Sequence, residues 1–218
     1  MIIIAHRGAS AYKKENTLKA FKKAFEMNAL YLETDIQRTA DGKLILYHDY
    51  KLKTGEQIKD CSYSYLKRFE VPLLEELFAV APQNFYINLE IKNDGNIYPD
   101  IEKQIFDFLN SQTSKNNILI SSFDFQTLKK IRILDNNIKI GVLTRDFDIK
   151  QPLQLNAYSV NISHKRITPQ IIKTCKENKL KVLVYTVNDI SLAKELEDMG
   201  VDGIFSDYPD LFYKQDTK

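Results

Sequence analysis

Short apolar runs alternate with amphipathic segments along almost the whole chain, and this alternation limits the possible folds more than any other feature. Apolar runs of strand length recur near residues 2, 31, 86, 118, 139, 158, 182 and 203. Helical spacing of apolar residues marks the segments between them, such as 17–28, 98–110 and 169–178. Eight such units in roughly 250 residues or somewhat fewer are typical of an α/β fold of the (β/α)8 TIM-barrel type. A doubly wound open sheet is the alternative.

The size and charge of the chain indicate a single globular domain that does not bind nucleic acid. A chain of 218 residues with 44% hydrophobic residues can bury a full core, so we expect one domain over residues 1–218. The net charge of +2 is ordinary, and no block of Lys and Arg is long enough to follow a phosphate backbone. Nucleic acid is therefore not an expected partner.

The amino-terminal run, MIIIAHRG, is too short for a signal-peptide core or a membrane span. We interpret it as the first buried strand of a cytoplasmic protein without stable membrane insertion. Cys61 and Cys175 have no CxxC partner and are too few for a disulfide framework, so both are expected to be reduced thiols without a role.

The segment from Tyr31 to Asp49 places carboxylates where a buried strand should be apolar. Glu33 and Asp35 are two residues apart, so in a strand both point to the same side. Asp41-Gly42 is a tight-turn signal, and the strand after it leads to His48. Because two like charges on one side require a compensating cation, we expect a metal ion between the carboxylates and His48 at the same site.

Other polar residues also follow predicted strands. His6-Arg7-Gly8 ends the first strand, and Glu90 and Lys92 end the third. Taken singly, a histidine here is more often structural, and Glu90 with Lys92 is an ordinary salt bridge. A barrel, however, brings the carboxyl ends of its strands to one face, where its chemistry lies. Three carboxylates without Cys ligands then suit a hard cation such as Mg²⁺ or Ca²⁺.

Two stretches lack a clear period. Residues 50–70 mix Lys, Tyr, Ser and Asp, and we interpret them as a small insertion at the surface after the hairpin of the second strand. Residues 144–156 contain Pro152 and predict no firm helix. Near the end of the seventh strand, Tyr185 and Asn188 either line a pocket or serve packing and capping.

The order of these motifs resembles the glycerophosphodiester phosphodiesterase family. The shared motifs are HRG with ENT (residues 6–8 and 15–17), ExD (33–35), HD (48–49) and ExK (90–92). The resemblance continues through VPLLEELF (71–78), SSF (121–123), VYTVN (184–188) and GVDGIFSDYPD (200–210), so it spans nearly the whole chain. HRG or ExD alone would be weak signals, whereas the ordered set is specific.

The resemblance implies a (β/α)8 barrel that hydrolyses glycerophosphodiesters to glycerol 3-phosphate and an alcohol. It implies His6 and His48 as the acid–base pair, Glu33, Asp35 and Glu90 as ligands of one divalent cation, Mg²⁺ or Ca²⁺, Arg7 and Lys92 as phosphate contacts, and Phe123 and Tyr185 in the substrate pocket. The expected partner is a small-molecule diester, and the oligomeric state is not predicted.

This sequence departs from the family pattern at two places. Tyr185 stands where Trp is common, and the segment after His48 is short and lacks a frequent RTT pattern. The first change bears on the substrate pocket, and the second indicates a reduced insertion. Two other function classes stay open: a barrel phospholipase of the lysophospholipase D or phosphoinositide-cleaving type, and a non-catalytic phosphate-binding barrel.

Overall fold

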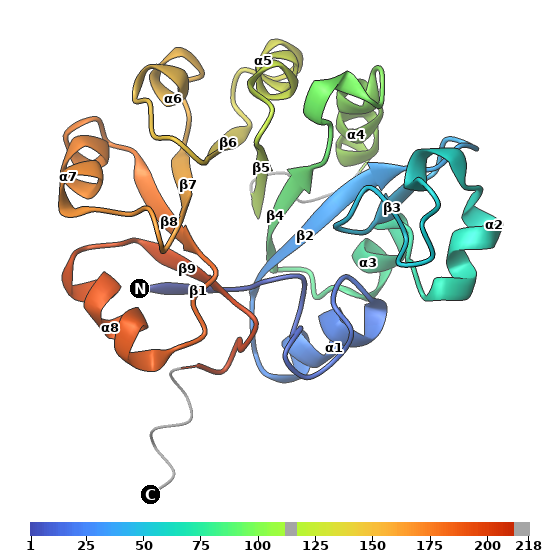
Figure 1. Cartoon of the computed structure of the whole chain (residues 1–218), viewed down its shortest axis with the longest axis horizontal. Helices are drawn as coiled ribbons and strands as arrows, with labels where there is room; N and C mark the ends of the chain where they lie inside the picture. Colours follow the sequence, from blue (N-terminus) through green and yellow to red (C-terminus); the bar gives the residue numbers. More distant parts are fainter. Residues whose placement is uncertain (112–116, 212–218) are drawn as a thin grey trace, which may run out of the picture.

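Eight parallel strands close into a barrel in the computed structural model, which describes residues 1–111 and 117–211 (Figure 1). The barrel strands are β1 (Ile2–Ala5), β2 (Tyr31–Arg38), β4 (Tyr86–Ile91), β5 (Ile118–Ser122), β6 (Lys139–Thr144), β7 (Ser159–Ser163), β8 (Lys181–Tyr185) and β9 (Gly203–Ser206). Strand β9 pairs with β1 from Ile2–Gly203 to Ala5–Ser206, and β1 also pairs with β2. This closure confirms the (β/α)8 prediction over an open doubly wound sheet, which would have two free edges.

Helices form the outer layer between the strands (Figure 1). They are α1 (Leu18–Glu26), α3 (Leu74–Val80), α4 (Ile101–Asn110), α5 (Phe125–Leu134), α6 (Lys150–Gln154), α7 (Pro169–Glu177) and α8 (Ile190–Asp198). Two of these helices begin with a side-chain cap: the Thr17 side chain accepts from the Ala20 amide, and the Thr168 side chain accepts from the Ile171 amide. Inside the ring, Ile4, Leu119, Leu183 and Phe205 pack together.

Helix α6 corrects the prediction for residues 144–156, where no firm helix was expected. It is a helix of 5 residues that contains Pro152. The proline lies in the first turn, where the missing N–H has no partner within the helix in any case. Helix α6 is also too short to show an apolar period in the sequence.

A hairpin follows β2, as expected. Strand β3 (Leu44–Leu46) pairs antiparallel with β2, and Gly42 adopts φ 77° in the turn between them. Residues 50–70 come next and contain α2 (Tyr63–Leu66) between two short 3-10 turns, Ile58–Asp60 and Lys67–Phe69.

The insertion has a small core of its own, whereas the sequence indicated only a surface connection. Its buried members are Ile45 from β3 with Leu52, Ile58, Cys61, Leu66 and Val71. The turns are too short for a repeating period, so the apolar residues are irregularly spaced even though they meet in space. Cys61 and Cys175 are both free and buried.

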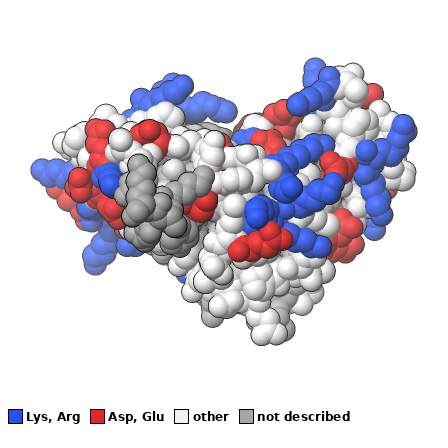
Figure 2. All heavy atoms as spheres, turned by 90° about the horizontal axis from the view of Figure 1, so that it is seen from below, with Lys and Arg blue, Asp and Glu red and all other residues white. Residues whose placement is uncertain are grey.

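The surface is of mixed charge on the face shown in Figure 2, where basic and acidic side chains lie interleaved. No helix within the described ranges is both long enough and apolar enough to cross a membrane.

Candidate active site

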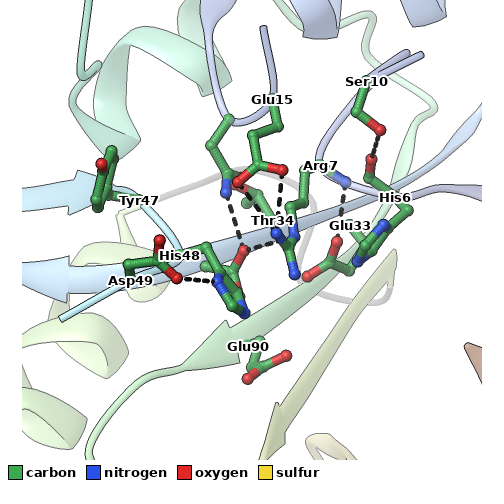
Figure 3. A network of polar contacts seen from close by, with 12 residues as sticks. His6, Arg7, Ser10, Glu15, Glu33, Thr34, Tyr47, His48, Asp49 and Glu90 are labelled. Atoms are coloured by element: carbon green, nitrogen blue, oxygen red, sulfur yellow. Dashed lines mark hydrogen bonds and ion pairs between the residues drawn. The ribbon is translucent and has the colours of Figure 1, made fainter. Parts of the chain in front are cut away.

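Three carboxylates on β2 and β4 meet at one site. Glu33 and Asp35 lie on β2, and Asp35 is the register partner of Glu90 on β4. One ligand oxygen from each residue lies within 4.8 Å of the other two, and all three side chains are buried. The strand alternation that predicted a common side for Glu33 and Asp35 is thus what brings them to Glu90. Glu33 and Glu90 are labelled in Figure 3.

Polar neighbours hold Glu33 and Asp35 in place. The backbone amide of Arg7 donates to Glu33 Oε2 at 2.9 Å, and Arg7 adopts φ 57° at this point of the loop after β1. Asn16 Nδ2 donates to Asp35 Oδ2 at 2.9 Å, while Asn16 Oδ1 accepts from the Thr34 hydroxyl at 2.6 Å. The loop before α1 therefore fixes both carboxylates from one side.

Two cations pair with the carboxylates. Arg7 Nε lies 3.3 Å from Asp35 Oδ2, and its Nη1 donates to both oxygens of Glu15 at 3.0 and 3.1 Å. Lys92 Nζ lies 2.5 Å from Glu90 Oε1 and 3.1 Å from Asp35 Oδ1. Burial alone would lower the pKa of Lys92, but these two carboxylates outweigh that effect and raise it.

The negative charge of the cluster is only partly compensated. Burial, with Asp35 and Glu90 nearby, raises the pKa of Glu33 well above its usual range. Burial and Asp35 likewise raise the pKa of Glu90 to about 7. Asp35 differs: although burial opposes ionisation, Lys92 and Arg7 lower its pKa to about 2. Glu33 and Glu90 thus favour a bound positive charge beside them.

The donor set fits a hard divalent cation. All three candidate ligand atoms are carboxylate oxygens close enough to share one ion, and among the described residues no other group of His, Cys, Asp and Glu is so arranged. Oxygen-only sites of this kind suit Mg²⁺ or Ca²⁺ better than Zn²⁺.

Each predicted catalytic histidine is held by an aspartate. His6 Nδ1 lies 2.7 Å from Asp207 Oδ1, and His48 Nδ1 lies 2.7 Å from Asp49 Oδ1. In Figure 3 the Glu33 carboxylate lies between the two imidazoles. The His6 and His48 side chains are 16% and 33% exposed, so both are open to the pocket. Burial lowers the pKa of His48, although Asp35 opposes this effect.

A cavity of about 350 Å³ opens above the carboxylates and contains most of the predicted site. Its walls include His6, Arg7, Glu33, His48, Glu90, Lys92, Phe123 and Tyr185. Asp35 is not in this wall and lies beneath it, fully buried. The cavity therefore combines the predicted acid–base, metal, phosphate and pocket residues in one space.

Sequence reasoning missed three residues of the site. Asn16 was quoted within the ENT motif without a role of its own, although its amide holds Asp35. Asp207 lies within the GVDGIFSDYPD motif, which was quoted without a role. Arg145 follows β6 in the stretch expected to be a plain link, and it lines the cavity. Only the position after a barrel strand marks Asp207 and Arg145 as candidates.

Fold and site together define a (β/α)8 barrel with a buried carboxylate cluster that could hold a cation, flanked by two His–Asp pairs. Residues 6–211 match the Glycerophosphoryl diester phosphodiesterase family. Curated relatives named glycerophosphodiester phosphodiesterase include one from Caldanaerobacter subterraneus subsp. tengcongensis, which is 31% identical over 96% of this chain and 95% of its own length. One from Bacillus altitudinis is 33% identical over 97% and 96%. The chain belongs to this family of phosphoric diester hydrolases.

Solved structures agree with this membership. A phosphodiesterase from Oleispira antarctica, in complex with the product sn-glycerol-3-phosphate, superposes with a TM-score of 0.91 at 25% identity and covers 98% of this chain and 96% of its own. A glycerophosphodiester phosphodiesterase from Thermotoga maritima gives a TM-score of 0.84 at 26% identity, with 98% and 97% covered.

Proposed function

We propose that this protein hydrolyses glycerophosphodiesters to glycerol 3-phosphate and an alcohol, with a divalent cation on Glu33, Asp35 and Glu90. The observation that carries the proposal is the placement of both histidines beside one buried carboxylate cluster that is open to a single cavity. A phosphodiester is an anion, so its hydrolysis requires charge neutralisation, an activated nucleophile and a protonated leaving group. The site has a group for each requirement.

The histidines would move the protons. His6 and His48 would act from opposite sides of the phosphate, one removing a proton from the attacking hydroxyl and the other giving one to the leaving alcohol. The attacking hydroxyl belongs either to water or to the glycerol 2-position, and in the second case a cyclic phosphate forms first. The aspartate at each Nδ1 would direct the other ring nitrogen, Nε2, into the cavity.

Arg7 and Lys92 would stabilise negative charge on the phosphate. Both line the cavity, yet both are also paired with cluster carboxylates. When bound, Mg²⁺ or Ca²⁺ would neutralise phosphate charge and make a nearby hydroxyl more acidic. Binding of the cation to the carboxylates would also leave the guanidinium and ammonium groups freer to donate to the substrate. A cytoplasmic place of action stays a prediction from the sequence.

The test is a panel of glycerophosphodiesters assayed with Mg²⁺, with Ca²⁺ and with chelator, and with lysophosphatidylcholine in parallel. Release of glycerol 3-phosphate that stops with chelator is the expected result. Hydrolysis of lysophosphatidylcholine in preference to the deacylated diester would instead place the enzyme among lysophospholipases D. Inactivity towards every diester with both metals would contradict the proposal and indicate a binding protein.

Substitution of either histidine tests the acid–base roles. His6→Ala and His48→Ala should each lower kcat by roughly 10²- to 10⁴-fold, the range for loss of a positioned general acid or base. His164→Ala is the matched control, because His164 is outside the cavity wall. Near wild-type activity in either site variant would remove that histidine from the mechanism.

A further inference from the structure

One wall of the cavity is built from three residues that play no part in the mechanism above. Phe123 follows β5, Arg145 follows β6 and Tyr185 ends β8, so all three lie at the carboxyl ends of their strands. The Arg145 guanidinium lies 4.4 Å from the centre of the Phe123 ring, and Phe123 meets Tyr185 edge-to-face at 6.2 Å and 84°. Tyr185 is further held by its hydroxyl, which donates to the Thr144 carbonyl at 3.4 Å.

Arg145 differs from the other cations of the cavity in its polar partners. Arg7 and Lys92 are both held by carboxylates. Arg145 makes no ion pair or hydrogen bond with any residue in 1–111 or 117–211, and its contact there is the ring of Phe123. Stacking fixes the plane of the guanidinium and leaves its N–H donors available for a ligand.

Arg145 lies where the outer part of a bound substrate would be. Glu33 and Glu90 are buried at the base of the cavity, whereas Arg145 is exposed at its rim. A diester whose phosphate lies at the carboxylates and histidines must extend one substituent towards the mouth. If the glycerol 2-hydroxyl is the attacking group, the glycerol stays near the cluster and the substituent at the rim is the head group.

The stacked pair also discriminates against one class of head group. Quaternary ammonium groups are recognised through open aromatic faces. Here the Phe123 face is already covered by a cation, which would repel a choline group placed nearby. A carboxylate, in contrast, can accept two parallel N–H bonds from a guanidinium.

We propose that Arg145, stacked on Phe123, binds the head group of the diester and selects head groups with a carboxylate over those with a quaternary ammonium. This assignment rests on the function proposed above. Arg145 is a specificity residue, and its contact exists before and during the reaction. Its loss should therefore raise KM for carboxylate-bearing substrates more than it lowers kcat.

Glycerophosphoserine and glycerophosphoethanolamine form a matched pair of probes, because they differ only by one carboxylate. The wild-type protein should have the higher kcat/KM for the serine ester, and glycerophosphocholine should be the poorest of the three. Arg145→Met should lower kcat/KM for the serine ester by about 10-fold, the factor expected for one charge-assisted hydrogen bond, and should not lower kcat/KM for the ethanolamine ester, whose ammonium group gains nothing from the Arg145 cation. It should also raise kcat/KM for the choline ester relative to that for the serine ester, because the Phe123 face is then uncovered.

Two further variants control the experiment. Arg68→Met removes an arginine that stacks on Tyr65 at 5.4 Å outside the cavity, and it should leave the serine-to-ethanolamine ratio unchanged. Arg145→Lys keeps the charge without the planar fork and should give an intermediate ratio. An equal decrease in kcat/KM for all three esters in Arg145→Met would mean that Arg145 contacts the shared phosphate or glycerol. That result would overturn the head-group assignment.

The ethanolamine ester separates the two proposals. If wild-type protein hydrolyses it but shows no Arg145-dependent preference for the serine ester, the proposed function stands and the role of Arg145 is overturned. If wild-type protein hydrolyses none of the three esters, both are overturned.

Discussion

Asp207 defines the chemical state of His6. Although burial opposes its ionisation, hydrogen bonds from His6, Asn188 and Ser10 lower the pKa of Asp207 to about 2. The carboxylate is therefore ionised at neutral pH and can only accept, so the proton of a neutral His6 lies on Nδ1. The lone pair is then on Nε2. A neutral His6 can thus accept a proton at Nε2, and so can a neutral His48, whose Nδ1 faces Asp49 in the same way.

Asp207→Asn should lower kcat by about 10- to 100-fold, the usual effect of losing the carboxylate that orients a functional histidine. The amide can still fill the space but can present N–H to Nδ1, which favours the wrong tautomer. The measurement is kcat with its pH profile, because a purely structural role would leave the profile in place. Asp210→Asn, which alters a carboxylate bonded to Tyr12, is the control.

Asp207 should also contribute to stability in a defined pH window. Its pKa is lowered in the folded state to about 2, against about 3.9 for an unfolded chain. Its stabilisation is therefore complete above about pH 4 and is lost as pH falls towards 2. The difference in free energy of unfolding between wild type and Asp207→Asn, measured by urea denaturation, should shrink over this interval. A difference that stays constant from pH 6 to pH 2.5 would contradict the linkage.

Contacts between site residues that are close in sequence were predictable, whereas hydrogen-bond partners from distant segments were not. Glu33 and Asp35 followed from strand alternation alone, and Glu90 followed from the rule that parallel strands end on one face. The partner of His6 is 201 residues away, so no local period marks it. Asn16 belongs to the ENT motif, and nothing in its immediate sequence indicates a bond to Asp35.

At the level of elements, long periodic segments were predicted well and short ones were not. Helices α4 and α7 lie within the predicted ranges 98–110 and 169–178. Helix α6 and the turns of residues 50–70 were missed because their lengths are shorter than the windows in which periodicity is measured. The turns of residues 50–70 are ordered by tertiary contacts, above all the burial of Ile58 and Leu66 with Ile45 of β3.

The small core of the insertion can be tested at Leu66, which is 0% exposed. Leu66→Ala removes buried methyl groups and should reduce the free energy of unfolding by about 2–5 kcal/mol. Ile133→Ala, at a side chain that is 83% exposed, should change it little and serves as the control. Thermal unfolding of both variants measures the effect. Equal stability of Leu66→Ala and wild type would show that the insertion packs independently of the barrel.

For the whole molecule, the cation should act as a stabilising ligand. An ion that binds only the folded protein adds about 2.7 kcal/mol at a concentration 100 times its Kd, and about 1 kcal/mol moves the Tm of a chain of this size by roughly 2–4 °C. The expected result is a Tm that rises with Mg²⁺ or Ca²⁺ and falls again with chelator.

Glu33→Gln and Glu90→Gln should weaken this response, because each removes a charged oxygen ligand. Exposed acidic side chains such as Glu177, altered to Gln, provide the control. An undiminished rise in Tm in the two site variants would place the ion elsewhere on the protein.

The barrel closes between β1 and β9, the first and the last of its strands to be translated. His6 is translated 201 residues before Asp207, the residue that holds it directly after β9. Residues 6–206 alone have every predicted metal ligand and both histidines, yet the first histidine lacks its acceptor. A nascent chain should therefore acquire full activity only when β9 has been translated and docked, so that hydrolysis begins when the ring is complete.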